Sequence, residues 1–260
     1  MDHGHMHHHP EPVWDSNLLI GLLVFSIVYL LIIRFMDKKE SEPTRITNLQ
    51  IIAFFVACSL FFLTFGSPMA AHNHHYLSVH MLQMSVISFV VPPLLIYSLP
   101  YTFLKKLVSL IKYPIVGVLF FASIFCFYHV PPLFDWLMSS HFLHTISHII
   151  LFGAALIMWL PFTPRLAGQV LGKNERKYMN VMMWFVMPPC IFLFVMNMEL
   201  YAMTQVQDHG KIFSNMIDQR LSGVIMILLH QLSMLTNMKA NQLENALTNI
   251  NVTKNTRWTS

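Results

Sequence analysis

Long apolar stretches alternate with short polar segments along the whole chain. A hydrocarbon core about 30 Å thick needs roughly 20 predominantly apolar helical residues to cross it. Seven stretches meet this requirement, and most contain no charged residue between their ends. They are roughly Leu18–Phe35, Leu49–Gly66, Leu77–Tyr97, Pro114–Pro131, Phe142–Leu160, Tyr178–Met198 and Ile217–Leu235. The pattern predicts an all-α polytopic membrane protein with seven transmembrane helices.

The first apolar stretch follows a polar segment and has no small-residue cleavage site after it. We therefore interpret it as a membrane anchor rather than as a removable signal peptide. The chain then divides into three parts: a His-rich extracytoplasmic tail (residues 1–17), the helical bundle (18–235) and a polar cytoplasmic tail (236–260). The Asn-rich stretch Lys239–Ser260 is expected to be weakly helical at best.

Lysine and arginine fall mainly on one side of this arrangement. Cytoplasmic loops retain these residues, so their distribution predicts the orientation of the chain. Of the 16 Lys and Arg residues, 14 lie on the side of the C-terminal tail. Only Lys211 and Arg220 lie on the other side. We expect the N-terminus outside and the C-terminus in the cytoplasm.

The composition supports the same class of protein. Only 11% of the residues are charged and 55% are hydrophobic, whereas a soluble domain carries about 25% charged residues. Cys58, Cys126 and Cys190 each lie inside an apolar run, so no disulfide framework is expected. Ordinary cytosolic proteins, disordered regulators and disulfide scaffolds are excluded. The net charge of +4 is explained by topology and requires no nucleic-acid partner.

Two predicted spans share the pattern Phe-Val-x-Pro-Pro, at Phe89–Pro93 and Phe185–Pro189. Paired broken helices can indicate an inverted-repeat transporter. Because the rest of the two halves does not align, chance or simple helix kinking is the favoured interpretation.

Histidines gather at the predicted outer side. Fourteen of the 15 lie on or near that face, and His230 alone lies deep toward the cytoplasmic half. His144 and His148 are one helical turn apart, and His80 and His129 are expected at a similar depth. Imidazole is the commonest metal ligand in proteins, so these four residues are candidate metal ligands.

Other residues make copper the favoured metal. Met84 follows His80 by one turn and Cys126 precedes His129 by three residues, and soft sulfur beside imidazole favours Cu(I). The outer tail adds His3, His5 and His7. A free amine followed by His3 can form a square-planar nitrogen site for Cu(II) or Ni(II). The alternative origin for this tract is an expression tag.

Acidic residues lie at the same predicted depth. Asp135 and Asp218 are candidate metal ligands or partners of the ligating histidines. Each also has a structural alternative, since Asp135 could cap a loop and Asp218 could cap the last helix. His230 is expected to be a core residue that hydrogen-bonds within the bundle.

Several motifs resemble one family. They are Tyr128-His-Val-Pro-Pro-Leu-Phe-Asp135, His144-Thr-Ile-Ser-His148, His80-Met81 ahead of a Pro-Pro span, and Asp218–Met226 at the start of the last span. Together these motifs, from the third span to the seventh, resemble the CtaG-type assembly factors of caa-type cytochrome c oxidase in Gram-positive bacteria. The resemblance implies a plasma-membrane protein that helps to mature a haem–copper oxidase. The positions of this sequence that the resemblance implies are functional are His80, His129, Asp135, His144, His148 and Asp218.

The leading hypothesis is an assembly factor that receives copper, with an extracytoplasmic protein as one possible donor, and passes it to an oxidase subunit. A metal-free scaffold, a haem or zinc protein and a transporter remain alternatives. No His-Glu-x-x-His or other hydrolytic motif is present, so an enzyme is not favoured. Polar ligands stop at the outer half apart from His230, which disfavours transport across the membrane.

Overall fold

The structure is a computed structural model that describes residues 14–37, 46–72, 75–164, 166–202, 212 and 214–257. Helices account for almost all of this part of the chain, and it contains no strand. The α-helices are α1 (Ser16–Asp37), α2 (Asn48–Phe65), α3 (Leu77–Ser85), α4 (Val91–Tyr97), α5 (Tyr101–Ser109), α6 (Pro114–Tyr128), α7 (Pro131–Met138), α8 (His141–Trp159), α9 (Ala167–Val170), α10 (Glu175–Val195) and α12 (Asn215–Arg257). The shorter elements are η2 (Pro68–His72), η3 (Val86–Val90), η4 (Leu160–Phe162) and η5 (Gly172–Asn174).

Among the described residues, six helical segments are long and apolar enough to cross a membrane. The third of them, Leu77–Tyr97, consists of α3, η3 and α4 and has the predicted bounds. The helices α5 and α6 pass the same test only as a pair, and they bend by 82° where they meet. Counting this pair as one span gives seven, so the prediction of an all-α polytopic membrane protein is confirmed.

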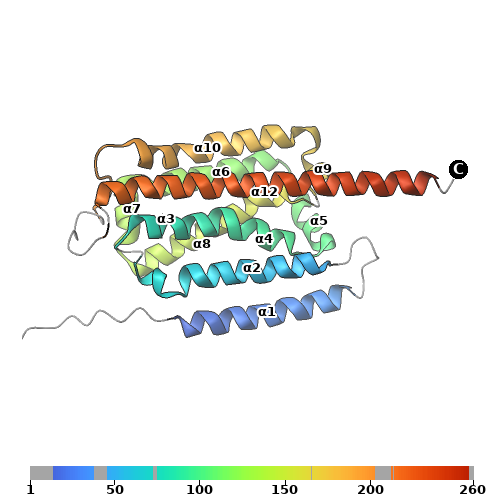
Figure 1. Cartoon of the computed structure of the whole chain (residues 1–260), viewed down its shortest axis with the longest axis horizontal. Coiled ribbons are helices and arrows are strands. Elements are labelled where there is room, and N and C mark those ends of the chain that lie inside the picture. The colour runs from blue at the N-terminus through green and yellow to red at the C-terminus, as the bar shows by residue number, and fades with distance from the viewer. Residues whose placement is uncertain are drawn as a thin grey trace, which may run out of the picture.

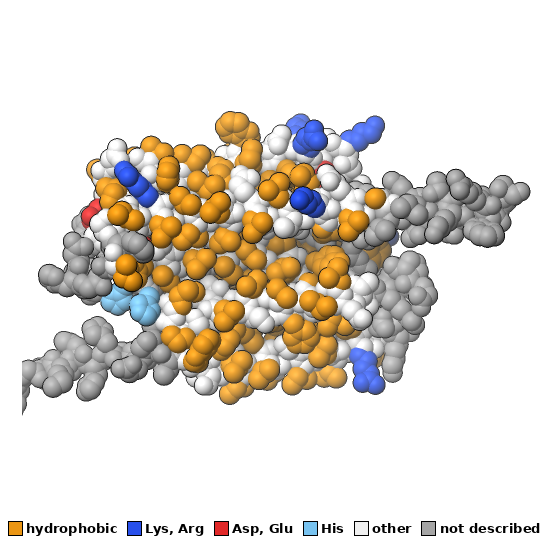
Figure 2. All heavy atoms as spheres, viewed as in Figure 1, with side chains coloured by type: hydrophobic (Ala, Val, Ile, Leu, Met, Phe, Trp, Pro, Cys, Tyr) orange, Lys and Arg blue, Asp and Glu red, His pale blue; other side chains and the backbone are white. Residues whose placement is uncertain are grey.

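The spans lie roughly side by side, with α1 at one edge of the bundle (Figure 1). The helix α12 packs against both α3 and α10, and α6 packs against α8 and α10. Apolar side chains cover most of the visible face (Figure 2). On α1, Leu23 and Leu31 are exposed, as expected for side chains that face lipid.

The two ends of the bundle differ in polarity. We call one end the histidine end: α1, α3, α8 and α12 begin there, and His72, His75 and His141 lie there. The other end carries Lys106 and Lys173, and most of the visible Lys and Arg side chains lie on that side in Figure 2. The histidine end corresponds to the side predicted to face outward, and the orientation itself stays a prediction.

A π-helical turn interrupts the third span because two prolines follow it. Pro92 and Pro93 have no N–H group, so the carbonyls of Ser88 and Phe89, four residues earlier, lose their usual helical donors. The Trp159 indole Nε1–H donates to the Ser88 carbonyl at 2.9 Å. The Ser233 hydroxyl donates to the Phe89 carbonyl. Side chains from α8 and α12 thus replace the missing backbone bonds and fix both helices against the turn.

The second Pro-Pro pair lies inside α10. Pro189 leaves the carbonyl of Phe185 without its helical donor, and the Cys126 thiol donates to that oxygen at 3.6 Å. Both Phe-Val-x-Pro-Pro patterns therefore leave carbonyls that a neighbouring helix satisfies. This shared chemistry favours helix kinking as the reason for the pattern.

The helix α12 corrects the prediction for the C-terminal segment. That segment was expected to be weakly helical at best, but α12 continues without a break to Arg257 and extends past the other helices (Figure 1). Adding residues to an existing helix avoids the cost of nucleation, which explains how a polar sequence continues it. Asn241 also donates a 2.7 Å hydrogen bond to the Glu175 carboxylate on α10.

Candidate metal centre

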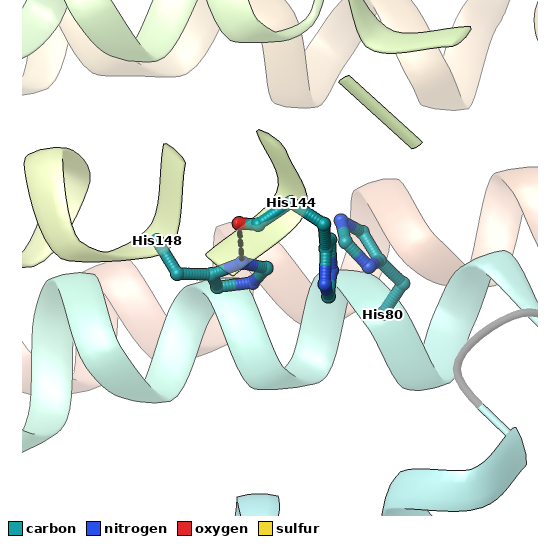
Figure 3. A group of neighbouring side chains, drawn as sticks. All are labelled: His80, His144 and His148. Atoms are coloured by element: carbon teal, nitrogen blue, oxygen red, sulfur yellow. Dashed lines mark hydrogen bonds between the residues drawn. The ribbon is translucent and has the colours of Figure 1, made fainter. Parts of the chain in front are cut away.

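Three histidines from two helices meet inside the bundle. His80 lies on α3, and His144 and His148 lie one turn apart on α8. Each offers one ring nitrogen, and the three nitrogens lie within 4.8 Å of one another. Figure 3 shows the rings of His80 and His148 on either side of the His144 ring. We call these residues the histidine cluster.

The rings of the cluster are close enough to share one ligand. Ring centroids are 4.3 Å apart for His144 and His148, and 5.4 and 5.5 Å apart for His80 and each of these two. His80 is fully buried, and at most 9% of either other residue is exposed. Burial of three imidazoles is costly unless their nitrogens are engaged, so the cluster is a candidate ligand site.

The hydrogen bond of His148 identifies the nitrogen that can bind a ligand. Its Nδ1 lies 2.9 Å from the carbonyl oxygen of His144, and a carbonyl only accepts, so Nδ1 carries the proton. The neutral ring then has its lone pair on Nε2. Within the part of the chain that the structure describes, this buried Nε2 has no hydrogen-bond partner. A histidine that binds a metal usually donates its other N–H in this way.

His80 is positioned by aromatic residues of the neighbouring helices. Its Nε2 lies 2.9 Å from the hydroxyl of Tyr128, at the end of α6. Its ring lies nearly perpendicular to that of Phe134 of α7, with centroids 5.3 Å apart. These contacts help to hold the imidazole in the cluster.

Asp218 supports the cluster indirectly, through the start of α3. Its carboxylate accepts hydrogen bonds from the backbone N–H groups of Leu77 and Ser78, at 2.6 and 3.2 Å. The first N–H groups of a helix have no partners within the helix, and a negative charge there is favourable. The metal-ligand prediction for Asp218 gains no support, because this residue of α12 caps α3 and lies outside the cluster.

A pocket of about 550 Å³ lies beside the cluster, between α2 and α8. His144 and His148 line it together with Gln83, whose amide donates to the Thr64 carbonyl. The remaining walls are mainly apolar and include Phe61 and Phe152. The cluster is therefore reached from a largely apolar cavity at the histidine end.

The structure does not bring His129 into the cluster. The residue follows the last residue of α6, and its Nδ1 lies 2.7 Å from the Phe125 carbonyl. Successive helical residues point about 100° apart, so Tyr128 reaches His80 while His129 packs on Phe125. The Tyr201 hydroxyl donates to the backbone carbonyl of His129 at 3.0 Å. Burial raises the pKa of Tyr201, so it stays a donor.

Asp135 also lies outside the cluster. Its two carboxylate oxygens accept from the backbone N–H of Ala202, at 3.1 and 3.2 Å. Gln219 of α12 contacts the same segment, because its side-chain oxygen accepts a 3.0 Å hydrogen bond from the backbone N–H of Leu200. These bonds fasten the segment after α10 to α7 and α12, which matches the structural alternative for Asp135.

The remaining predicted histidines occupy other places. His3, His5 and His7 lie outside the described residues. His72 is exposed, and its Nδ1 lies 3.2 Å from the Pro68 carbonyl. His230 is buried against Phe89, and neither of its ring nitrogens bonds to a residue that the structure describes. The expectation of a hydrogen-bonded core histidine at His230 is therefore only half met.

Three residues near the cluster were not singled out as site residues from the sequence. Tyr128 precedes His129 in the motif Tyr128–Asp135. Because it lies one residue earlier on α6, its hydroxyl points toward His80. Gln83 follows His80 by three residues and thus lies on nearly the same face of the third span. His141 precedes His144 by three residues and lines the same pocket. Helical spacing from His80 and His144 was the signal that could have found the last two.

The geometry of the cluster suits a metal ion. An ion bound at about 2.0 Å by three imidazole nitrogens holds them roughly 3.5 Å apart. The ring nitrogens of the cluster lie within 4.8 Å of one another, not far from that separation. Among the described residues, the cluster consists of three histidines and contains no carboxylate. The ligands that it offers to a metal ion are therefore neutral imidazoles.

The fold and this site define a multi-pass helical membrane protein with a buried group of three histidines. A family model for the cytochrome c oxidase caa3 assembly factor (Caa3_CtaG) matches residues 27–240. The chain therefore belongs to this family, and the resemblance inferred from its motifs is confirmed. It is a multi-pass protein of the bacterial cell membrane with a role in cytochrome c oxidase assembly. Comparison with curated proteins and with solved structures gave no match.

Proposed function

We propose that the protein holds a copper ion at the histidine cluster and passes it to a subunit of the oxidase. The observation that carries the proposal is the approach of three ring nitrogens from two helices to within 4.8 Å. Two imidazoles one turn apart are common on helices. A third imidazole from α3 at the same point is what an ion-binding site requires.

The neutral ligand set favours Cu(I) over a divalent ion. The cost of burying an ion rises with the square of its charge, and no carboxylate of the cluster offsets it. A monovalent ion therefore suits this buried site better than Zn²⁺ does. Imidazole ligands are suitable for copper, and an open position on the ion would remain toward the pocket.

Haem fits the same cluster less well. Two axial histidines require a porphyrin ring between them. The nitrogen of the third histidine lies within 4.8 Å of both others and takes up part of that space. A single ion is therefore the better ligand for the three rings.

The pocket offers a route for transfer to the partner. Its walls are mainly apolar, so a membrane-embedded segment of an oxidase subunit could approach His144 and His148 there. Copper would move by exchange of imidazole ligands for those of the partner, without a change in oxidation state. The His-rich N-terminal segment would capture the ion before it reaches the cluster.

Elemental analysis of the purified protein tests the proposal. We expect about one equivalent of copper after reconstitution with Cu(I), and its loss in the variant with alanine at His80, His144 and His148. The control variant carries His72→Ala and His230→Phe, which alter two histidines outside the cluster. All proteins in this measurement lack the N-terminal segment, so that its histidines do not contribute to the measured copper content.

The same substitutions, placed in the chain with its N-terminal segment intact, are then tested in cells for oxidase maturation, measured as the copper-dependent absorbance and activity of the oxidase. The triple variant should lose maturation and the control should keep it. Full maturation by the triple variant would overturn the copper proposal and leave a metal-free scaffold. Zinc in place of copper would also contradict it.

A further inference from the structure

The chain enters the bundle at the edge of the pocket. The Trp14 ring stacks on Phe62 of α2, with centroids 5.6 Å apart and an angle of 19° between the rings. The backbone N–H of Asp15 donates to the Gly66 carbonyl at 2.9 Å. Leu18, in the first turn of α1, lines the pocket itself. The point where residues 1–13 join the described chain is therefore fixed beside the cavity.

Gly66 makes this close entry possible. A Cβ at this position would lie 2.6 Å from the ring of Phe62 and 3.1 Å from Leu18. Any larger residue would require the Phe62 ring or the Leu18 side chain to shift. Glycine at this position leaves room for both side chains where α1 meets α2.

Histidines of α8 lead from the mouth of the pocket to its interior. His141 is exposed, and His144 and His148 follow on the same face of the helix and are buried. His80 completes the cluster from α3 and is fully buried. An ion that reaches His141 can pass inward between neighbouring imidazoles, one turn at a time.

The N-terminal segment is long enough to reach this mouth. It contains His3, His5, His7, His8 and His9. An extended chain covers at most about 3.6 Å per residue, so His9 lies within roughly 18 Å of Trp14 and His3 within roughly 40 Å. A short tether of this kind gives an effective concentration of about millimolar at the site to which it is tied.

We propose that residues 1–13 of this same chain dock at the mouth of the pocket and load the histidine cluster through His141. The inference rests on the proposed function for the metal and adds the partner that delivers it. In each step one imidazole–Cu(I) bond to a histidine of the segment breaks as a bond to a histidine of α8 forms. No electron is transferred, and the histidine that is released stays neutral.

Cysteine cross-linking tests the docking without any metal. Cys58, Cys126 and Cys190 are replaced by serine, and Pro10→Cys is combined with Thr145→Cys in the pocket. The control pair combines Pro10→Cys with Ser139→Cys, which is exposed at the same end but does not line the pocket. With a short bifunctional maleimide in chelator, we expect at least a fivefold higher yield for the pocket pair. Equal yields, or a higher yield for the control, would overturn the proposal.

Loading kinetics test the transfer. Cu(I) is supplied as a chelator complex to the full chain and to a variant with alanine at all five histidines of the segment. We expect a loading rate at least tenfold slower in that variant, with the same final occupancy of the cluster. His141→Ala should slow loading in the full chain as well.

An unchanged rate would overturn delivery by the segment. If neither protein binds copper at the cluster, the proposed function fails. The cross-linking yields still decide whether the segment docks in the pocket, so the two failures are distinguishable. A lipid chain in the pocket, in place of the segment, would give equal cross-linking for the two cysteine pairs.

Discussion

Single positions decide what each histidine of this protein can do. His80, His144 and His148 converge because their side chains lie on facing sides of α3 and α8. His129 lies next to Tyr128 in sequence, yet only the tyrosine reaches His80. The difference is one step of about 100° around α6. Depth along a helix is thus insufficient to assign a ligand.

Tyr128→Phe tests the contact between this hydroxyl and His80. Removing a group that orients a metal ligand usually weakens metal binding by about 10- to 100-fold. We expect a decrease in Cu(I) affinity in that range with the stoichiometry unchanged, measured by competition with a chromophoric chelator. Tyr178→Phe is the control, since its hydroxyl donates to the Met158 carbonyl. Equal losses in both variants would contradict a specific role for Tyr128.

His230→Phe tests the buried histidine outside the cluster. Replacing a buried polar group that lacks partners with an apolar one of similar shape is nearly neutral or stabilising. We expect the Tm of the purified protein to stay the same or rise, and copper binding to be unchanged. His230→Ala should lower the Tm because it leaves a cavity. A loss of oxidase maturation in folded His230→Phe would instead assign this residue a function.

At the scale of helices, the bundle compensates for backbone groups that its own sequence leaves unpaired. The first N–H groups of α3 have no partner within that helix, and they donate hydrogen bonds to the carboxylate of Asp218 on α12. The prolines after η3 leave carbonyls that Trp159 and Ser233 satisfy. Both repairs cross between helices, so they couple helix ends to tertiary packing.

Asp218→Ala removes the cap from α3. Loss of a capping carboxylate costs about 1 to 2 kcal/mol of stability, and the cap lies one turn before His80. We expect a lower Tm and weaker copper binding, with Asp218→Asn between the wild type and Asp218→Ala. Asp135→Ala should lower the Tm without weakening copper binding, because the partner of the Asp135 carboxylate among the described residues is Ala202, in the segment after α10. Unchanged stability of Asp218→Ala would refute the capping role.

Trp159→Phe removes the donor to the Ser88 carbonyl. A buried carbonyl left without a partner costs about 1 to 3 kcal/mol. We expect a corresponding decrease in Tm, and a smaller decrease when Pro92→Ala is added, because alanine supplies an N–H in the same span. The double-mutant cycle, measured by thermal unfolding in detergent, gives the coupling between the two sites. Additive effects would show that the indole does not compensate for Pro92.

The whole molecule is a polarised bundle with histidines at one end and most of its lysine and arginine at the other. Of the six apolar helical segments found among the described residues, α1 is the least buried, since only 17% of its apolar window is buried inside the bundle. The cluster, its pocket and the entry point of the N-terminal segment all lie at the histidine end. A metal supplied from that side would meet exposed histidines before buried ones.

Cysteine labelling tests the predicted orientation. Ser139→Cys at the histidine end and Lys112→Cys at the other end are each introduced into a chain without its three native cysteines. In intact cells a membrane-impermeant maleimide should label Ser139→Cys and should spare Lys112→Cys until the membrane is opened. The reverse pattern would show that the histidine end faces the cytoplasm.

The sequence by itself determined the class of the protein, most span boundaries and the end at which the histidines gather. These properties depend on local composition: about 20 apolar residues cross a membrane, and lysine and arginine mark one side of it. The motifs from the third span to the seventh also identified the family. Polarity and length act along the chain, so the sequence alone was sufficient for them.

Only the tertiary structure decided which of the predicted residues meet. His80 joins His144 and His148 because the third span packs against α8 through η3 and α4, and nothing local to either span specifies that neighbour. Asp218 and Asp135 turned toward backbone N–H groups of other elements for the same reason. The sequence also did not reveal the helical course of residues 239–257, because continuation of α12 depends on the helix before it. Contacts between helices depend on packing of the whole bundle, which a pattern read along one chain does not contain.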